Sequence, residues 1–296
     1  MLEKDFISII KNTLNSKYIG DDCAYLKNLG IVITQDSLVE DVHFSLEFMS
    51  AYQLGYKSMM VNISDVASSG AQIKYLTIAL SLPKNIDKSF VEEFYKGAKK
   101  ALPKGVEIVG GDITGSDKIM VSVCAIGSTK ERNISSRKNA KIGYKVVVVG
   151  AHGLSGAGLE QLLNNKPINE KFQKAHLMPQ AQVEFGNLIG ATVKEPYAMM
   201  DTSDGLMDAL STIANESNVL LDIDFNKIPK DEDLIKLPSY KDLILYGGED
   251  YGIVAVIPAQ YDFGTCIGEV KQGLGVSLED KLYSKIDVEQ KLFNHF

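Results

Sequence analysis

The hydrophobic residues of this chain follow two spacings, one typical of helices and the other of strands. In the first half, helical spacing is found in three segments, residues 2–14, 51–70 and 90–102. Short apolar runs typical of buried strands are found in four others, residues 31–36, 74–82, 106–112 and 118–127. Because the two kinds of element alternate, the first half is predicted to pack helices on a sheet.

A polar segment over residues 129–143 separates this half from the second and is the best candidate for a domain boundary. After it come an apolar strand at 146–149, a glycine-rich turn and a helical pattern that starts at Leu159. Further helices are expected at 180–193 and 204–217, and further strands at 197–201 and 219–225. We therefore predict an α/β (α+β) fold with mixed or antiparallel sheets, in an N-terminal domain of residues 1–137 and a C-terminal domain of residues 138–296.

The composition excludes several classes of protein. Hydrophobic residues make up 45% of the chain and charged residues 23%, as in ordered globular proteins. The net charge of −7 argues against a nucleic-acid groove or an anionic membrane surface. No apolar run approaches the roughly 20 residues that a membrane span requires, and the three cysteines form no C-x-x-C pair. We therefore expect a cytoplasmic protein that binds neither nucleic acid nor membrane.

The most informative residues are six aspartates: Asp22, Asp36, Asp65, Asp112, Asp201 and Asp204. Three of them, Asp36, Asp112 and Asp201, end or directly follow apolar runs, so they are expected at the ends of buried strands. Several carboxylates gathered there would be costly unless divalent cations neutralised them. The pattern therefore predicts a site where Mg²⁺ bridges to the phosphates of a substrate.

The same residues also have simpler interpretations. Ser203-Asp204-Gly205 alone would be a helix N-cap, but Asp201 three residues earlier adds a second carboxylate at a strand end. Cap and ligand site are compatible there. Asp22, Asp36 and Asp65 could each belong to a turn, a strand exit or a solvated helix face; only their order and contexts together indicate a site.

Other motifs are better explained by structure alone. The glycine-rich segment 150–158 matches neither common nucleotide-binding pattern and is expected to be a tight connection between a strand and a helix. Residues 222–226 imitate the start of a calcium loop but lack its glycine, which favours an alternating edge strand. The four histidines have no zinc spacing, and only His43 stands out, because it follows Asp36 on the segment that leaves the predicted site.

Six segments, in this order, resemble the thiamine-monophosphate kinase family. They are residues 19–24 (IGDDCA), 34–44 (TQDSLVEDVHF), 61–71 (VNISDVASSGA), 110–114 (GGDIT), 201–206 (DTSDGL) and 246–251 (YGGEDY). The final residues Phe293-Asn-His-Phe296 are similar to the aromatic-x-His-Phe ending of that family. The wider superfamily also contains aminoimidazole ribonucleotide synthetase and selenophosphate synthetase.

The resemblance implies an assembly and a set of site residues. The N-terminal domain would pair with a second subunit in a barrel-like interface, giving a homodimer, and ATP would bind in a cleft between the domains. The implied magnesium positions, for several ions, are Asp22, Thr34, Gln35, Asp36, Asp65, Asp112, Asp201 and Asp204, with Asp65 and Asp204 essential for catalysis. The implied nucleotide contacts are Gly111, Asp112, Arg137 and Ser203. The implied thiamine-phosphate contacts are His43, Glu249 and Phe293.

The expected reaction is transfer of the γ-phosphoryl group of ATP to the phosphate of thiamine monophosphate, giving thiamine diphosphate. A phosphate oxygen is already a nucleophile at neutral pH, so catalysis would rest on alignment and charge neutralisation. An enzyme like aminoimidazole ribonucleotide synthetase and a non-catalytic nucleotide-binding regulatory subunit remain the alternatives. Three residues depart from the family pattern around the outer metal shell: Asp41 where glycine is frequent, Gln35 where a hydroxyl is usual and Gly252 where an acidic residue is frequent.

Overall fold

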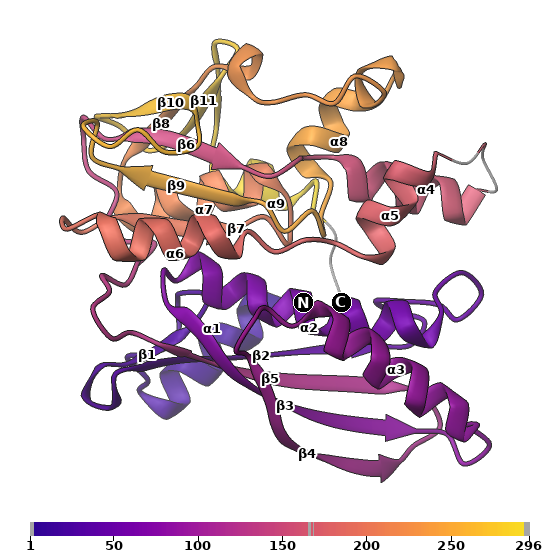
Figure 1. Ribbon diagram of the computed structural model, residues 1–296. Helices are drawn as coiled ribbons and strands as arrows, with labels where there is room; N and C mark the ends of the chain where they lie inside the picture. Colours follow the sequence, from indigo (N-terminus) through magenta and orange to yellow (C-terminus); the bar gives the residue numbers. More distant parts are fainter. Residues whose placement is uncertain (1–2, 165–166, 168, 293–296) are drawn as a thin grey trace.

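The computed structural model describes residues 3–292, apart from 165, 166 and 168. The chain forms two units, each built from one sheet and its helices, and a segment over residues 129–144 joins them (Figure 1). The fold is mixed α/β, as the alternation of spacings predicts. The last strand of the first sheet ends at Ser128 and the first strand of the second begins at Lys145. A domain boundary between residues 137 and 138 stays a prediction.

The N-terminal unit has a five-stranded sheet in the order β1-β2-β5-β3-β4. Its strands are β1 (Ala24–Leu26), β2 (Ile31–Val39), β3 (Gln72–Leu82), β4 (Glu107–Gly115) and β5 (Met120–Ser128), and its helices are α1 (Glu3–Leu14), α2 (Ala51–Ser68) and α3 (Lys88–Ala101). All neighbours are antiparallel except β3 and β4. Helices α2 and α3 lie on the side of the sheet that faces the C-terminal unit (Figure 1). The core therefore lies between this sheet and α2.

Two local features fix α2 where it lies. Ser50 and Gln53 form a capping box, in which each side chain bonds to the backbone N–H of the other. Helix α3 crosses α2 at glycines: a Cβ on Gly55 would lie 1.9 Å from Phe94 O, and a Cβ on Gly97 would lie 1.8 Å from Tyr52 O. Only glycine permits so close an approach, so these residues set the position of α2 against its neighbour.

The C-terminal unit has a seven-stranded mixed sheet in the order β12-β11-β8-β10-β6-β9-β7. Its strands are β6 (Lys145–Val149), β7 (Ala198–Asp201), β8 (Leu220–Ile223), β9 (Ile253–Ile257), β10 (Thr265–Lys271), β11 (Gly275–Leu278) and β12 (Lys281–Tyr283). Its helices are α4 (Leu154–Asn164), α5 (Glu170–Leu177), α6 (Val183–Thr192), α7 (Leu206–Ser217), α8 (Tyr240–Tyr246) and α9 (Lys285–Glu289). Helix α6 packs against α2 of the other unit, so the two cores meet along α2.

The structure corrects several expected elements. Strands β2 and β4 continue past Asp36 and Asp112, so these aspartates lie inside strands and do not end them. Helix α4 begins at Leu154, inside the glycine-rich turn, where a start at Leu159 is expected from sequence. Helices α5 and α8 have no counterpart in the sequence analysis, since each has only two turns of apolar periodicity. Within the described residues, no helix is both long enough and apolar enough to cross a membrane.

Candidate active site

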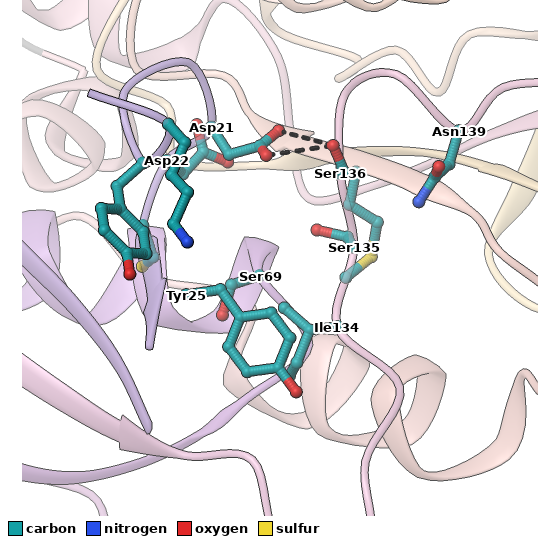
Figure 2. Close-up of a pocket in the computed structure, with 12 residues that line it drawn as sticks. Asp21, Asp22, Tyr25, Ser69, Ile134, Ser135, Ser136 and Asn139 are labelled. Carbon is teal, nitrogen blue, oxygen red and sulfur yellow. Dashed lines mark hydrogen bonds between the residues drawn. The ribbon is translucent and has the colours of Figure 1, made fainter. Parts of the chain in front are cut away.

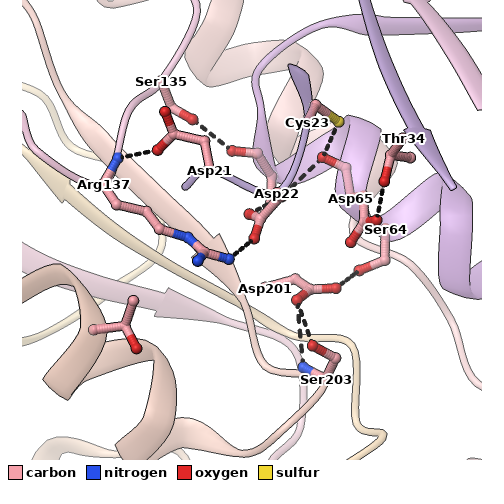
Figure 3. A network of polar contacts seen from close by, with 12 residues as sticks. Asp21, Asp22, Cys23, Thr34, Ser64, Asp65, Ser135, Arg137, Asp201 and Ser203 are labelled. Carbon is pink, nitrogen blue, oxygen red and sulfur yellow. Dashed lines mark hydrogen bonds and ion pairs between the residues drawn. The ribbon is translucent and has the colours of Figure 1, made fainter. Parts of the chain in front are cut away.

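Three aspartates from distant parts of the sequence meet where the two units touch. Asp22 precedes β1, Asp65 lies on α2 and Asp201 ends β7. One carboxylate oxygen from each lies within 4.8 Å of the other two, and Figure 3 shows the three side chains gathered at one point. The structure thus brings together three of the predicted ligands; metal binding by them stays a prediction.

Hydroxyl groups hold all three carboxylates. The donor–acceptor pairs are Thr34 Oγ1 to Asp65 Oδ2 at 2.6 Å, Ser64 Oγ to Asp201 Oδ2 at 2.6 Å and Ser68 Oγ to Asp22 Oδ2 at 2.5 Å. Ser203 Oγ also donates to Asp201 Oδ1, at 2.9 Å. Because Ser64 and Ser68 belong to α2, one helix orients a carboxylate of each unit as well as carrying Asp65.

Crowding and burial destabilise the charged forms of these acids. Burial raises the pKa of Asp65 well above its ordinary value, and the charges of Asp36, Asp201 and Asp22 raise it further. Burial and the charge of Asp22 raise the pKa of Asp201 to about 7, although the hydrogen bonds from its serine neighbours lower it. A cation bound between the carboxylates would remove this cost. The donors are all hard oxygens, so the set fits Mg²⁺.

Arg137 reaches the cluster from the segment that joins the units. Its guanidinium forms an ion pair with Asp22, and its backbone N–H donates to Asp21 Oδ1 at 2.7 Å (Figure 3). Burial opposes the charge of Arg137, but Asp22 and Asp21 outweigh it and raise its pKa above the ordinary value. The guanidinium is thus fixed beside a predicted metal ligand, where a phosphate could also be bound.

Asp36 and Asp204 lie around the three carboxylates. The backbone N–H of Asp36 donates to Asn62 Oδ1 on α2, at 3.0 Å, and the charge of Asp36 acts on Asp65. Asp204 is exposed and directly precedes Gly205, the N-cap residue of α7. Burial raises the pKa of the Tyr251 hydroxyl, and Asp36, Asp201 and Asp204 are among the charges that raise it further. Both residues therefore border the site.

Gln35 does not reach the cluster with its side chain. Side chains alternate along β2, so Thr34 and Asp36 face α2 while Gln35 faces the opposite side of the sheet. There its Nε2 donates to Ser122 Oγ on β5, at 3.2 Å. A role for Gln35 in metal binding stays a prediction.

Within a single chain, Gly111 and Asp112 also lie away from the three-carboxylate cluster. Both are on β4, the edge strand, and Asp112 is exposed and pairs with Ala79. Gly111 has a structural reason to be glycine, because a Cβ there would lie 1.9 Å from Ile78 O. The nucleotide and metal roles of these two residues remain predictions.

A pocket of about 280 Å³ opens beside Asp22 (Figure 2). Its walls come from β1 and the segment before it, from Ser69 at the C-terminal end of α2, from the segment that joins the units and from Met199 on β7. Figure 2 shows Asp21 bonded to Ser136 across one side, with Tyr25 and Asn139 on other sides. Polar and apolar groups share these walls, so the pocket suits a ligand that has both kinds of surface and lies next to the carboxylates.

Two of the three predicted thiamine-phosphate contacts lie near each other. His43 Nδ1 accepts from the backbone N–H of Val39, at 3.1 Å, and its ring contributes to a lowered pKa of Glu249. The third predicted contact, Phe293, lies outside the described residues. Glu249 also has two partners that sequence reasoning missed: Lys57 Nζ lies 2.9 Å from Oε1, and His176 Nδ1 lies 3.3 Å from Oε2.

Two of the departures from the family pattern have structural explanations. Asp41 has a φ of +62°, a left-handed conformation that glycine adopts most easily and aspartate tolerates. Its carboxylate pairs with exposed Lys118, at 3.1 Å. At position 252, a Cβ would lie 2.7 Å from Cε1 of buried His152, so the histidine fills the space that a larger residue would need. Neither residue alters the three-carboxylate cluster.

Comparison with known proteins identifies the family to which this fold and this site belong. Residues 20–129 match the family described as AIR synthase related protein, N-terminal domain. The thiamine-monophosphate kinase of Aquifex aeolicus (strain VF5) is 37% identical over 99% of this chain and 98% of its own length. That of Bacillus subtilis (strain 168) is 34% identical over 81% of this chain and 77% of its own.

The same family emerges from solved structures. The complex described as AaThiL complexed with AMPPCP and TMP superposes with a TM-score of 0.89, at 35% identity over 100% of this chain and 97% of its own. The chain therefore belongs to the thiamine-monophosphate kinase family.

Proposed function

We propose that this chain transfers the γ-phosphoryl group of ATP directly to the phosphate of thiamine monophosphate. An oxygen of the acceptor phosphate forms the new P–O bond, the bond from the γ-phosphorus to the bridging oxygen breaks, and its electron pair leaves with ADP. The observation that carries this proposal is the convergence of Asp22, Asp65 and Asp201 from both units within 4.8 Å. The names of the relatives and the AMPPCP and TMP in the related complex support the choice of substrates.

The carboxylates would hold Mg²⁺, which when bound supplies positive charge between two phosphate groups that otherwise repel each other. Asp22, Asp65 and Asp201 are the proposed inner set, with Asp36 and Asp204 on its border. Thr34 orients Asp65 through its hydroxyl group. The protein residues thus act by fixing position and charge; no covalent intermediate is needed.

Each of the remaining site residues would contact one of the two substrates. Arg137 and Ser203 are the proposed nucleotide contacts, since both bond directly to carboxylates of the cluster. His43 and Glu249 are the proposed contacts to thiamine monophosphate, together with Phe293. Glu249 N–H donates to Ser203 O at 2.6 Å, so a proposed thiamine-monophosphate contact and a proposed nucleotide contact are direct neighbours.

We also propose a homodimer formed through the N-terminal sheet. Its face away from α2 carries exposed apolar side chains, including Tyr75 at 45% and Met120 at 40% exposure. No described helix covers that face. A second copy of the sheet would cover it, and edge strand β4 with Asp112 would then lie at the interface. A cytoplasmic location is proposed as well, in keeping with three free cysteines.

A single assay tests the reaction. The protein is incubated with ATP, thiamine monophosphate and Mg²⁺, and thiamine diphosphate is measured by chromatography, with and without EDTA. Thiamine diphosphate should form only with Mg²⁺ present. ATP binding without turnover would favour a regulatory subunit, and turnover only with the substrate of the purine-biosynthesis synthetase would favour the other enzyme.

A further inference from the structure

Glu249 is held by one partner on each carboxylate oxygen. Lys57 Nζ, on α2 of the N-terminal unit, lies 2.9 Å from Oε1. His176 Nδ1, on α5 of the C-terminal unit, lies 3.3 Å from Oε2 and 3.1 Å from Ser155 Oγ. Since the two partners approach from different units, they fix both the direction of the side chain and the rotation of its carboxylate plane.

The backbone around Glu249 is also constrained. Glu249 has a φ of +62°, which is unusual for a residue other than glycine, and Tyr251 has a φ of +50°. The carboxylate of Asp250 accepts hydrogen bonds from the N–H groups of Gly153 and Ser155 at the start of α4. These contacts of the neighbouring Asp250 help to keep the strained conformation of Glu249 in place.

The charges in this arrangement suit a particular kind of ligand. Lys57 is fully buried, and Nζ has no hydrogen-bond partner among the described residues other than its ion pair with Glu249. The Glu249 side chain is 28% exposed, so only Glu249 can meet a ligand. Burial raises the pKa of Glu249, but Lys57 is the largest opposing charge and the pKa is lowered, so the group is ionised at neutral pH. Burial lowers the pKa of His176 to about 4, so that ring is neutral there.

Because Lys57 lies directly behind Glu249, their opposite charges largely cancel at the position of a ligand. A cation would gain little there and would be repelled by Lys57. A neutral N–H donor would still gain a hydrogen bond from an oriented carboxylate. In thiamine, the amino group of the aminopyrimidine is such a donor, whereas the thiazolium ring carries the cation and has no N–H.

On the basis of the proposed function, we propose that Lys57 and His176 are positioning residues that orient Glu249 to accept a hydrogen bond from the amino group of the aminopyrimidine. Glu249 thereby determines specificity for this ring, and it is not the counter-ion of the thiazolium. Lys57 acts through Glu249 on the vitamin substrate and leaves the nucleotide unaffected.

The first test needs no variant. Wild-type kcat/KM is measured for thiamine monophosphate and for oxythiamine monophosphate, in which an oxo group replaces the amino group. An acceptor facing Glu249 cannot form the bond, so the amino substrate should be preferred by roughly 100-fold. A preference below about threefold would overturn the assignment. Failure of the wild type to phosphorylate thiamine monophosphate at all would instead refute the proposed function, and this inference with it.

Two variants test the roles separately. In Glu249→Gln, Lys57 should hold the amide oxygen and leave the NH₂ group toward the ligand, so the preference for the amino substrate should shrink to within about threefold. Lys57→Met should raise the KM for thiamine monophosphate by about 10-fold or more and change the KM for ATP less than twofold. The matched control is Ser58→Ala, because Ser58 is buried on the same helix and its hydroxyl donates, among the described residues, to Leu54 O alone, at 2.7 Å.

Thermal unfolding of each variant shows whether it is folded, and so separates the contrary results from a loss of folding. An unchanged preference in Glu249→Gln would show that Glu249 does not contact the amino group. Equal increases in both KM values in Lys57→Met would show that Lys57 only supports the fold. If Lys57→Met fails to fold, the double variant Lys57→Met/Glu249→Gln removes both charges. Without Lys57 to hold the amide oxygen, its preference for the amino substrate should differ from that of Glu249→Gln.

Discussion

At the scale of single residues, the site depends on charges that the fold makes unfavourable. Asp201 is buried, Asp22 and Asp65 are partly buried, and only Arg137 forms a described ion pair with any of the three. The hydroxyl groups around them satisfy hydrogen bonds but add no charge. A ligand that brings positive charge would therefore bind with a large electrostatic gain.

Arg137 is expected to serve ATP and not the vitamin, because it is fixed beside Asp22 and has no described contact with Glu249. Arg137→Ala should raise the KM for ATP by roughly 10-fold or more and the KM for thiamine monophosphate by less than about twofold. Steady-state kinetics with each substrate varied in turn measures both constants. Lys138→Ala, which removes an exposed neighbouring cation, is the control. A selective effect on thiamine monophosphate would contradict the assignment.

His152 provides a test based on pH. It is fully buried and lacks described partners on both ring nitrogens, and burial lowers its pKa to about 4. The folded state therefore resists protonation below the unfolded value of about 6.5, and the stability due to neutral His152 is lost as pH falls toward 4. Relative to His152→Leu, the wild type should lose roughly 3 kcal/mol between pH 7.5 and 4.

Urea denaturation of the two proteins at pH 7.5, 6, 5 and 4 gives this difference, since other titrating groups cancel. A difference between the two proteins that stays constant over this range would mean that His152 takes up its proton equally in both states.

At the scale of elements, α2 is the helix on which the site is built. It carries Asp65, and its serines orient carboxylates of both units. It also carries Lys57, which reaches Glu249 of the C-terminal unit. Small shifts of α2 would therefore misplace the proposed metal ligands and the proposed substrate contact together.

The glycine crossing between α2 and α3 allows this to be tested. In Gly97→Ala, a methyl group placed 1.8 Å from Tyr52 O must push the helices apart. We expect a loss of roughly 1–3 kcal/mol in the free energy of unfolding, and a lower kcat because Asp65 moves with α2. Gly115→Ala is the control, since no atom lies within 4 Å of its Cβ position. Denaturation and activity are measured on both variants, and equal behaviour of the two would contradict this role of the crossing.

Much of the fold follows from local patterns in the sequence. The long helix α2 and the strands β3, β5 and β6 agree with their apolar spacing to within two residues. The ends of β2 and β4 are not predicted, because an aspartate in mid-strand has the same local pattern as one at a strand end. Asp22, Asp65 and Asp201 converge as expected, but no periodicity determines which sheet face Gln35 occupies or that Asp112 lies on an edge.

Lys57 illustrates what the sequence analysis missed. A lysine in a helical pattern is normally assigned to a solvated face, since burial of an ammonium is costly without a partner. One signal was available: α2 is 18 residues long and has only Lys57 and Asp65 as charged side chains. So few charges indicate a helix buried on all sides. Its partner Glu249 lies almost two hundred residues away, and His176 lies on a helix that was not expected.

At the scale of the whole molecule, the uncovered face of the N-terminal sheet has the properties of an interface. Leu76, Ile78 and Leu80 on β3 are fully buried under α2, whereas Tyr75 on the opposite face is largely accessible. Polar Gln35 and Ser122 lie on this same face and bond to each other. A mixed apolar and polar face of this kind suits pairing with a second copy.

Dimerisation can be tested by one charge on this face. Tyr75→Glu should shift the protein from dimer to monomer, because an unpaired carboxylate in an apolar contact costs several kcal/mol. Sedimentation velocity at several concentrations measures the assembly. The control is Leu282→Glu on β12, an exposed apolar residue of the other unit. A monomeric wild type, or a dimeric Tyr75→Glu, would contradict the proposed interface.

In the proposed reaction, the clustered aspartates work by binding Mg²⁺ at the transferred phosphoryl group. The most direct measurement is the single-turnover rate of thiamine diphosphate formation by Asp65→Asn, followed over a wide range of Mg²⁺ concentrations. Asparagine keeps the size and the hydrogen bond to Thr34 but removes the charge. We predict a rate lower by roughly three orders of magnitude or more at saturating Mg²⁺, with the fold retained. A near-normal rate at saturating Mg²⁺ would contradict this account of the site.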